Sequence, residues 1–221
     1  MMWQMALHPK HLKNNFKIKF LSVFLLISYS SLGQNITLKT GDFIFQSMNC
    51  GPLCEAINEV TEGYQGKDFS HMGMVYVKND STFIIEASGN SVRLTTLETF
   101  KSYTKETMYV GRLKRRYRKL IPKAISFSLQ QIGIPYDDAY LYDNGSYYCS
   151  ELMYDAFLFA YGKPFFQLVP MTFKSPKTNT YFPVWEDYYH KLKMEIPEGK
   201  LGCNPGGIST SDKLKIIGTL N

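Results

Sequence analysis

The fold of this chain is decided at residues 143–152, which read Asp-Asn-Gly-Ser-Tyr-Tyr-Cys-Ser-Glu-Leu. The Asp-Asn-Gly-Ser run predicts a turn, and Ser146 is of a residue type that caps the start of a helix. After the turn, apolar residues recur with helical spacing on one face, from Cys149 through Leu152 to Ala160. This spacing predicts a helix that begins near Cys149.

Cys149 falls in the first turn of the predicted helix. Unpaired backbone N–H groups and the positive end of the helix dipole favour an anion there. The position therefore stabilises a thiolate and prepares the cysteine to act as a nucleophile. The alternative is a small buried hydrophobic residue, since free cysteine is among the most buried residue types.

Length and composition predict one compact domain with a real core. The chain has 221 residues, of which 44% are hydrophobic and 15% aromatic. The net charge of +6 suggests nucleic-acid binding, but four lysines and no acidic residue lie in residues 1–33, so the remainder is nearly neutral. The dense basic run at residues 114–119 indicates a solvated strand end or helix start. We therefore expect no nucleic-acid partner.

Residues 1–33 are typical of an export signal. Lysines precede an apolar run at residues 20–27, and small residues follow it. This run is shorter than the roughly 20 residues of a membrane span, so we expect cleavage before Gln34, with a retained segment as the alternative. The expected mature domain is residues 34–221, exported to the periplasm or cell envelope.

Export leaves the state of three cysteines open. In an oxidising compartment, Cys50, Cys54 and Cys203 could pair. The spacing Cys50-x-x-x-Cys54 without a nearby histidine pair is a weak signal for zinc. Simple packing of one or all three is a further alternative. We expect no metal and no cofactor.

A hairpin carries the second group of candidate residues. Residues 69–77 and 82–87 have the composition of strands around a polar turn. With a loop of two or four residues, Glu86 lies opposite Gly73 and reaches His71 diagonally. A carboxylate there can hold the imidazole in the orientation and tautomer that a general base needs. A loop of three or five residues would place Glu86 on the opposite face.

The remaining pattern is that of an α+β domain. An aromatic and proline-rich loop at residues 161–189 is expected to cover the site and to end in a short strand or helix. Residues 201–207 are interpreted as a turn cluster. Other strands are expected at residues 38–46, 92–97 and 108–113, helices at 50–61, 97–103 and 122–132, and a short last element at 211–217.

Four short motifs have to be considered together. They are Gly-Asp-Phe-Ile-Phe-Gln at 41–46, Phe-Ser-His-Met-Gly-Met-Val at 69–75, Ile-Glu-Ala at 85–87 and Tyr-Tyr-Cys-Ser-Glu-Leu at 147–152. In this order they resemble the YaeF/YiiX group of permuted papain-like proteins in the NlpC/P60 superfamily. The resemblance implies a circularly permuted papain-like fold, with an antiparallel sheet or small barrel packed against the nucleophile helix.

The resemblance also implies roles for individual residues. By motif match, Cys149 would be the nucleophile, His71 the base and Glu86 the residue that orients the base. Gly133-Ile134-Pro135-Tyr136 is similar to the Gly-x-Pro-Tyr that precedes the cysteine in NlpC/P60 enzymes, where the tyrosine faces the active site. The further candidates for substrate binding or oxyanion stabilisation are Tyr136, Gln46 and Tyr148.

The expected function is that of an exported cysteine amidase or peptidase. It would hydrolyse amide bonds of small cell-envelope peptides, or N-acyl or lipid-linked amides, through an acyl-enzyme on Cys149. An acyltransferase using the same acyl-enzyme and a non-catalytic exported binding protein are the alternatives. The expected partner is the small substrate, while peripheral membrane association and the oligomeric state are left open.

Overall fold

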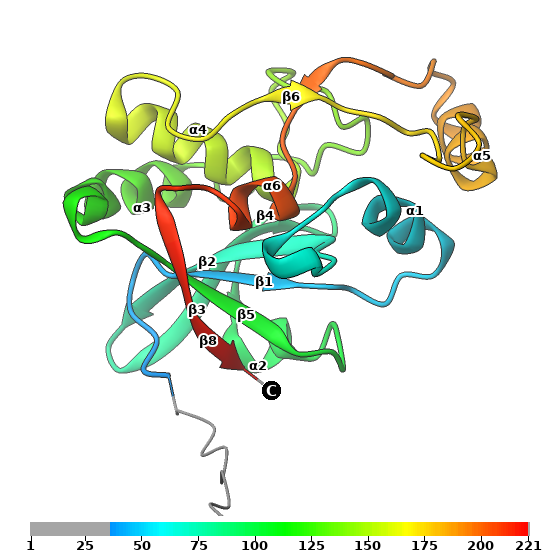
Figure 1. The fold of residues 1–221 in the computed structure, drawn as a ribbon. Helices are drawn as coiled ribbons and strands as arrows, with labels where there is room; N and C mark the ends of the chain where they lie inside the picture. Colours follow the sequence, from blue (N-terminus) through cyan, green and yellow to red (C-terminus); the bar gives the residue numbers. More distant parts are fainter. Residues whose placement is uncertain (1–35, 221) are drawn as a thin grey trace, which may run out of the picture. The chain divides into compact units, whose positions relative to one another are not determined.

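A six-stranded antiparallel sheet forms the centre of the computed structural model, which describes residues 36–220 (Figure 1). The strand order is β4-β3-β2-β1-β5-β8. The strands are β1 (Phe43–Gln46), β2 (His71–Lys78), β3 (Ser81–Ser88), β4 (Ser91–Thr96), β5 (Met108–Leu113) and β8 (Leu214–Leu220). The predicted export signal at residues 1–33 lies outside the described residues.

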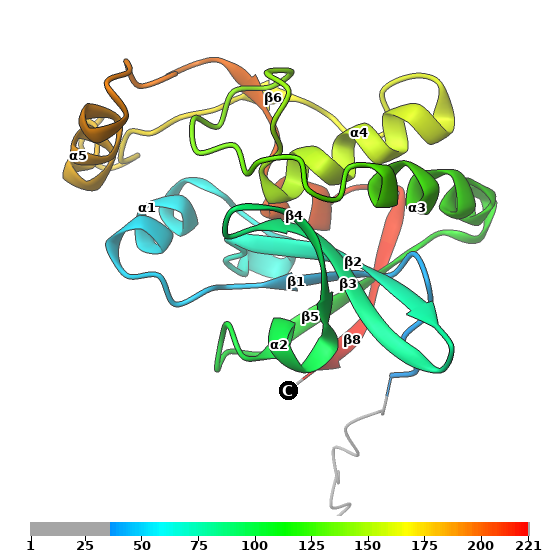
Figure 2. The ribbon, with the colours of Figure 1, turned by 180° about the vertical axis from the view of Figure 1, so that it is seen from behind.

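Helices pack on both faces of this sheet. Helices α3 (Ile121–Gln130) and α4 (Cys149–Tyr161) lie side by side on one face, and α2 (Leu97–Lys101) lies on the other (Figures 1 and 2). The remaining elements are α1 (Pro52–Val60), α5 (Pro183–Leu192), α6 (Pro205–Ser209), the 3₁₀ helices η1 (Tyr64–Gly66) and η2 (Arg115–Leu120), and the short pair β6 (Val169–Pro170) and β7 (Leu201–Gly202). Within residues 36–220, no helix has the length and apolar character needed to cross a membrane.

The first three residues of β1, residues 43–45, are apolar because both faces of the strand are covered. Phe43 and Phe45 belong to the main core, which includes Phe157 of α4. Ile44 points to the opposite face and packs in a second cluster with Phe100 of α2. The α+β prediction with an antiparallel sheet is therefore confirmed, and the sheet is open rather than a closed barrel.

The β2–β3 hairpin has the loop length on which the Glu86 argument depended. Lys78 pairs with Ser81, so the loop consists of Asn79 and Asp80. Both loop residues have positive φ, 49° and 59°, as a tight hairpin turn requires. Glu86 therefore lies on the same face of the sheet as Gly73 and His71.

The segment at residues 201–207, expected to be a turn cluster, is instead β7 and the start of α6. The Asn204 side chain caps α6 by accepting a hydrogen bond from the Gly207 N–H at 2.7 Å. Pro205 follows at the first helical position, where its missing N–H costs nothing. These two residues offset the low helix propensity of the two glycines.

The structure also decides between the alternatives for the cysteines. Cys50 and Cys54 form a disulfide at the start of α1. Cys149 and Cys203 are free and buried. Cys203 packs within the main core, so its role is unlike that of the disulfide pair.

Candidate active site

Cys149 is the first residue of α4 and is 5% exposed. The prediction that Ser146 caps this helix is wrong, because the chain is still extended at Tyr148, which is the N-cap residue. Instead, the Glu151 carboxyl group accepts hydrogen bonds from the backbone N–H groups of Tyr148 at 3.4 Å and Asp143 at 3.0 Å. The helix start is thus tied to the preceding turn by Glu151.

Sequence reasoning missed this role of Glu151, although a signal was present. An acidic residue three positions after the N-cap is the second half of a capping box. Identifying it required locating the cap at Tyr148 rather than at Ser146. Burial raises the pKa of Glu151 to about 8, although the hydrogen bond from the Asp143 N–H acts in the opposite direction and lowers the pKa.

His71 and Glu86 are in direct contact. The Nε2 atom of His71 donates to Glu86 Oε2 at 2.6 Å, and both side chains are buried. Gly73 lies two residues after His71 on the same strand and is opposite Glu86 on the next one. A Cβ atom at Gly73 would come within 2.3 Å of Ile84 Cγ2. The hairpin therefore brings together two of the predicted site residues, and Gly73 is needed for its packing.

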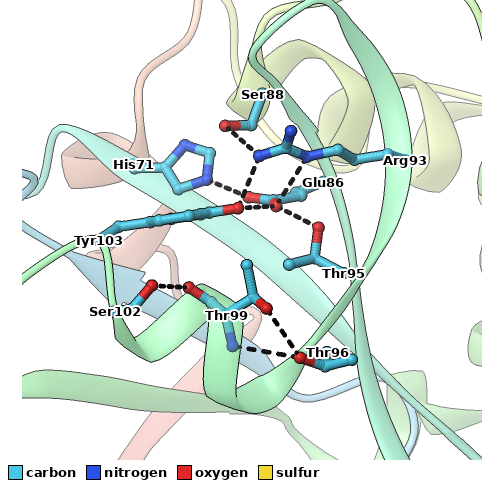
Figure 3. Close-up of polar contacts among 9 residues, drawn as sticks. All are labelled: His71, Glu86, Ser88, Arg93, Thr95, Thr96, Thr99, Ser102 and Tyr103. Carbon is cyan, nitrogen blue, oxygen red and sulfur yellow. Dashed lines mark hydrogen bonds and ion pairs between the residues drawn. The ribbon is translucent and has the colours of Figure 1, made fainter.

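Three further side chains surround the second oxygen of Glu86. The Oε1 atom accepts hydrogen bonds from Thr95 Oγ1 at 2.5 Å, the Tyr103 hydroxyl at 3.1 Å and Arg93 Nε at 3.3 Å (Figure 3). Burial raises the pKa of Glu86, but His71, Thr95 and Arg93 together hold it below its ordinary value. Glu86 is therefore a fully hydrogen-bonded anion on the face of the sheet that α2 covers.

Arg93, Thr95 and Tyr103 were missed by sequence reasoning. A signal for Arg93 existed in the Gly-Asn turn at residues 89–90, because a two-residue loop there places Arg93 directly opposite Glu86. Thr95 lies two residues further along the same face. Tyr103 comes from beyond α2, so no local pattern places it here.

Cys149 and Glu86 both act on the ionisation of His71. Burial lowers the pKa of His71, but hydrogen bonding and charge from Cys149 and Glu86 raise it to about 9. Because Glu86 binds Nε2, the ring nitrogen left for Cys149 is Nδ1. At neutral pH these two neighbours therefore favour the protonated form of His71.

A cavity of about 160 Å³ opens beside Cys149 and is lined mainly by aromatic and aliphatic side chains. Its wall includes the predicted site residues Tyr136 and Tyr148, and also Tyr140, Met171, Phe173 and Trp185. The last three come from residues 161–189, as expected for a segment that covers the site. The hydroxyl of Tyr136 pairs with that of Tyr140 at 3.5 Å, whereas the hydroxyl of Tyr148 accepts a hydrogen bond from the Cys203 N–H at 3.1 Å.

Gln46, the remaining candidate, does not line this cavity. It is fully buried and lies directly opposite His71 in the β1–β2 register. Its amide nitrogen and oxygen are both buried and have no hydrogen-bond partner among the described residues.

The proteins that are similar to this chain include two from Escherichia coli. The uncharacterized protein YiiX of Escherichia coli (strain K12) is 28% identical over 130 residues, which is 56% of this chain and 59% of YiiX. The match thus spans less than two thirds of YiiX. A crystal structure of metalloprotein yiiX from Escherichia coli O157:H7 matches with a TM-score of 0.67 and 22% identity, covering 82% of this chain and 97% of that one.

The structural similarity shows that the two proteins share a fold. The word metalloprotein describes the Escherichia coli O157:H7 protein. Within residues 36–220 of this chain, no group of three or more His, Cys, Asp and Glu side chains is arranged to hold a metal ion.

A family model described as permuted papain-like amidase enzyme, YaeF/YiiX, C92 family, matches residues 37–218. This range includes the Cys149 helix, all of the residues around the cavity, and the sheet except for the last two residues of β8. The permuted order is visible in the fold, since the histidine strand β2 precedes the cysteine helix α4. The chain belongs to the YaeF/YiiX family of permuted papain-like amidases.

Proposed function

We propose that this chain is an exported cysteine amidase that hydrolyses small amides through an acyl-enzyme on Cys149. The observation that carries the proposal is the arrangement around His71. Its Nε2 atom is bound to Glu86 at 2.6 Å, and Cys149 at the start of α4 raises its pKa. A cysteine and a histidine oriented by a third group form the arrangement of cysteine acyl-transfer enzymes.

In the first half of the proposed reaction, the Cys149 thiolate attacks the carbonyl carbon of the substrate amide. A C–S bond forms, and the carbonyl oxygen becomes an oxyanion. The imidazolium of His71 then donates its proton to the leaving nitrogen as the C–N bond breaks. The amine departs, and the acyl group stays on sulfur as a thioester.

In the second half, neutral His71 takes a proton from water. The resulting hydroxide attacks the thioester carbonyl, a C–O bond forms and the C–S bond breaks. The products are a carboxylic acid and the regenerated pair of Cys149 thiolate and His71 imidazolium. Glu86 supports each step by holding the imidazole and stabilising its charged form.

The oxyanion needs hydrogen-bond donors in both halves. The backbone N–H of Cys149 is the first candidate, because the first N–H groups of a helix have no partner within it. The second candidate is the hydroxyl of Tyr136, which lines the cavity beside Cys149. Loss of one such donor typically costs about 3 to 4 kcal/mol of transition-state stabilisation.

The proposed substrate carries a small apolar group next to the scissile amide. The cavity volume of about 160 Å³ and its lining by Tyr140, Phe173 and Trp185 support this choice. A short peptide with an apolar side chain, or an N-acyl amino acid, would supply such a group more readily than a polymer would. Export would bring the enzyme to amides of the cell envelope.

The test is mass spectrometry combined with turnover. The exported protein is incubated with intact sacculi, soluble muropeptides, N-acyl amino acids and phospholipid, and Cys149→Ala is the control. An acyl adduct on Cys149 and release of the acid from a small amide would support the proposal. Release from intact sacculi alone would overturn the small-substrate assignment.

Two further outcomes decide between the alternatives for the chemistry. Transfer of the acyl group to an added amine or alcohol in preference to water would make the enzyme an acyltransferase. If the unmodified protein binds a ligand but does not turn it over, and Cys149→Ala binds that ligand equally well, the chain would be a binding protein.

A further inference from the structure

A basic and aromatic surface lies at the end of α4 that is remote from Cys149. It is formed by η2, the first turn of α3, and the last turn of α4 with the residues that follow it (Figure 1). We define this basic surface by seven exposed cationic residues and two exposed aromatic ones. They are Lys114, Arg115, Arg116, Arg118, Lys119, Lys123, Lys163, Phe159 and Tyr161.

Contacts between side chains show that these segments form one surface. The Lys123 ammonium lies 5.9 Å from the centre of the Phe159 ring, which joins the start of α3 to the end of α4. Tyr161 packs edge-on against Phe165 at 5.4 Å, and Phe165 packs against Tyr117 of η2 at 5.1 Å. The side chains of the three segments are therefore in contact and form one continuous surface.

Charge on this surface is almost unopposed. Residues 113–136 and 156–185 contain no aspartate or glutamate. Among residues 36–220, none of the seven cationic side chains forms an ion pair. The acidic group nearby is Asp212, which is paired with Lys213 and is close enough to Lys114 and Arg116 for their charge to lower its pKa.

Large apolar side chains are exposed among these charges. Phe159 is 53% exposed and Tyr161 is 39% exposed, although both lie on a helix whose other aromatic residues are buried. A solvated basic surface that only kept the protein soluble would not need them. Cations surrounding exposed aromatic rings are typical of proteins that lie on membranes, where rings enter the interface and Lys and Arg bind anionic headgroups.

We propose that this basic surface docks the protein peripherally on a bilayer rich in anionic phospholipid. Phe159 lies ten residues after Cys149 on α4, so the helix rise separates the two by about 15 Å. Docking therefore holds the reactive cysteine above the membrane rather than inside it. The site would then act on amides in the aqueous layer next to the headgroups.

Vesicle co-sedimentation tests this proposal. The chain is expressed in an exporting host, recovered in its exported form and mixed with vesicles of equal parts phosphatidylglycerol and phosphatidylcholine, or of phosphatidylcholine alone. We expect binding to the anionic vesicles that weakens with added salt. The triple variant Arg115→Glu, Arg116→Glu, Lys119→Glu should lower the partition coefficient by about 100-fold or more. Phe159→Ser should lower it severalfold.

A second triple variant separates this surface from total charge. Lys105→Glu, Lys191→Glu and Lys200→Glu make the same change in net charge at exposed positions outside the basic surface. This control should bind almost as well as the unmodified protein, and circular dichroism checks that each variant is folded. The N-terminus is the same in all variants, whether or not residues 1–33 are removed. Any contribution of that segment to vesicle binding is therefore equal in each of them.

Three results would overturn the proposal. One is an equal loss of binding in the two triple variants, which would mean that net charge alone attracts the protein. Another is equal binding to neutral and anionic vesicles. The third is tighter binding to an RNA or DNA duplex than to anionic vesicles at the same salt concentration, which would make the surface a nucleic-acid site.

Discussion

The hydroxyl group of Tyr148 accepts a hydrogen bond from the backbone N–H of Cys203 at 3.1 Å, although the two residues are 55 positions apart in the chain. On the other side of Cys149, Ser150 Oγ donates to the Cys203 carbonyl oxygen at 2.9 Å. The two neighbours of Cys149 are thus fixed to a single residue of the C-terminal segment. This segment positions the start of α4 without supplying a reacting group.

Removing the Tyr148 hydroxyl should weaken the fold and the site together. Tyr148→Phe leaves the buried Cys203 N–H without its partner, which costs about 1 to 3 kcal/mol of the free energy of unfolding. We expect kcat to fall as well, because the helix start is held less firmly. Urea unfolding and steady-state kinetics measure the two effects. Tyr76→Phe is the matched control, since that hydroxyl has no partner among residues 36–220, and an equal effect there would contradict the assignment.

Replacing Glu86 with Gln should lower turnover less than replacing His71 with Ala. General acid–base catalysis contributes roughly 10²- to 10⁴-fold, which His71→Ala should lose, whereas Glu86 acts only through His71. The charged pair requires protonated His71, whose pKa is about 9 in the intact site. Loss of the Glu86 charge lowers this pKa, so the alkaline limb of the kcat/KM profile should move to lower pH.

The control for this experiment is Glu106→Gln, a carboxylate that is exposed on the loop before β5. It should change neither kcat nor the pH profile. Equal losses from Glu86→Gln and His71→Ala would assign Glu86 a direct part in the chemistry. An unchanged profile in Glu86→Gln would show that another residue orients His71.

Cys149 should be the thiol that iodoacetamide labels at neutral pH. The thiolate is the reactive form, and protonated His71 beside it favours that form. Burial raises the pKa of Cys203, so this second free thiol should stay unlabelled in the folded protein. Peptide mapping of the alkylated protein measures both sites.

The same experiment has a control within the chain. His71→Ala should slow the labelling of Cys149, while His190→Ala, which changes an exposed histidine on α5, should not. Labelling that is indifferent to His71 would refute the proposed pairing of cysteine and histidine.

Two of the four cysteines should titrate as free thiols in the unfolded, unreduced protein, since Cys50 and Cys54 are joined. Their short loop predicts that Cys50→Ser with Cys54→Ser costs about 2 kcal/mol of stability. The disulfide lies at the start of α1, and neither cysteine lines the cavity beside Cys149, so kcat should persist. Four free thiols, or loss of activity in a folded double variant, would contradict this description.

The sequence by itself determined the local parts of this protein. Helical spacing placed Cys149 at the start of a helix, and strand alternation with a polar turn predicted the hairpin. Both follow from interactions between residues that are near in the chain, where backbone geometry sets which side chains share a face. The same reasoning made the contact between His71 and Glu86 conditional on loop length, and Asn79 and Asp80 satisfied that condition.

Only the tertiary structure decided which distant groups complete the site. Tyr103 reaches Glu86 from beyond α2, Cys203 anchors the start of α4, and Trp185 closes the cavity beside Cys149. It also chose the pairing of Cys50 with Cys54 from the three open alternatives. The physical reason is that each of these contacts depends on how whole elements pack against one another. No periodicity or spacing within a single segment encodes that packing.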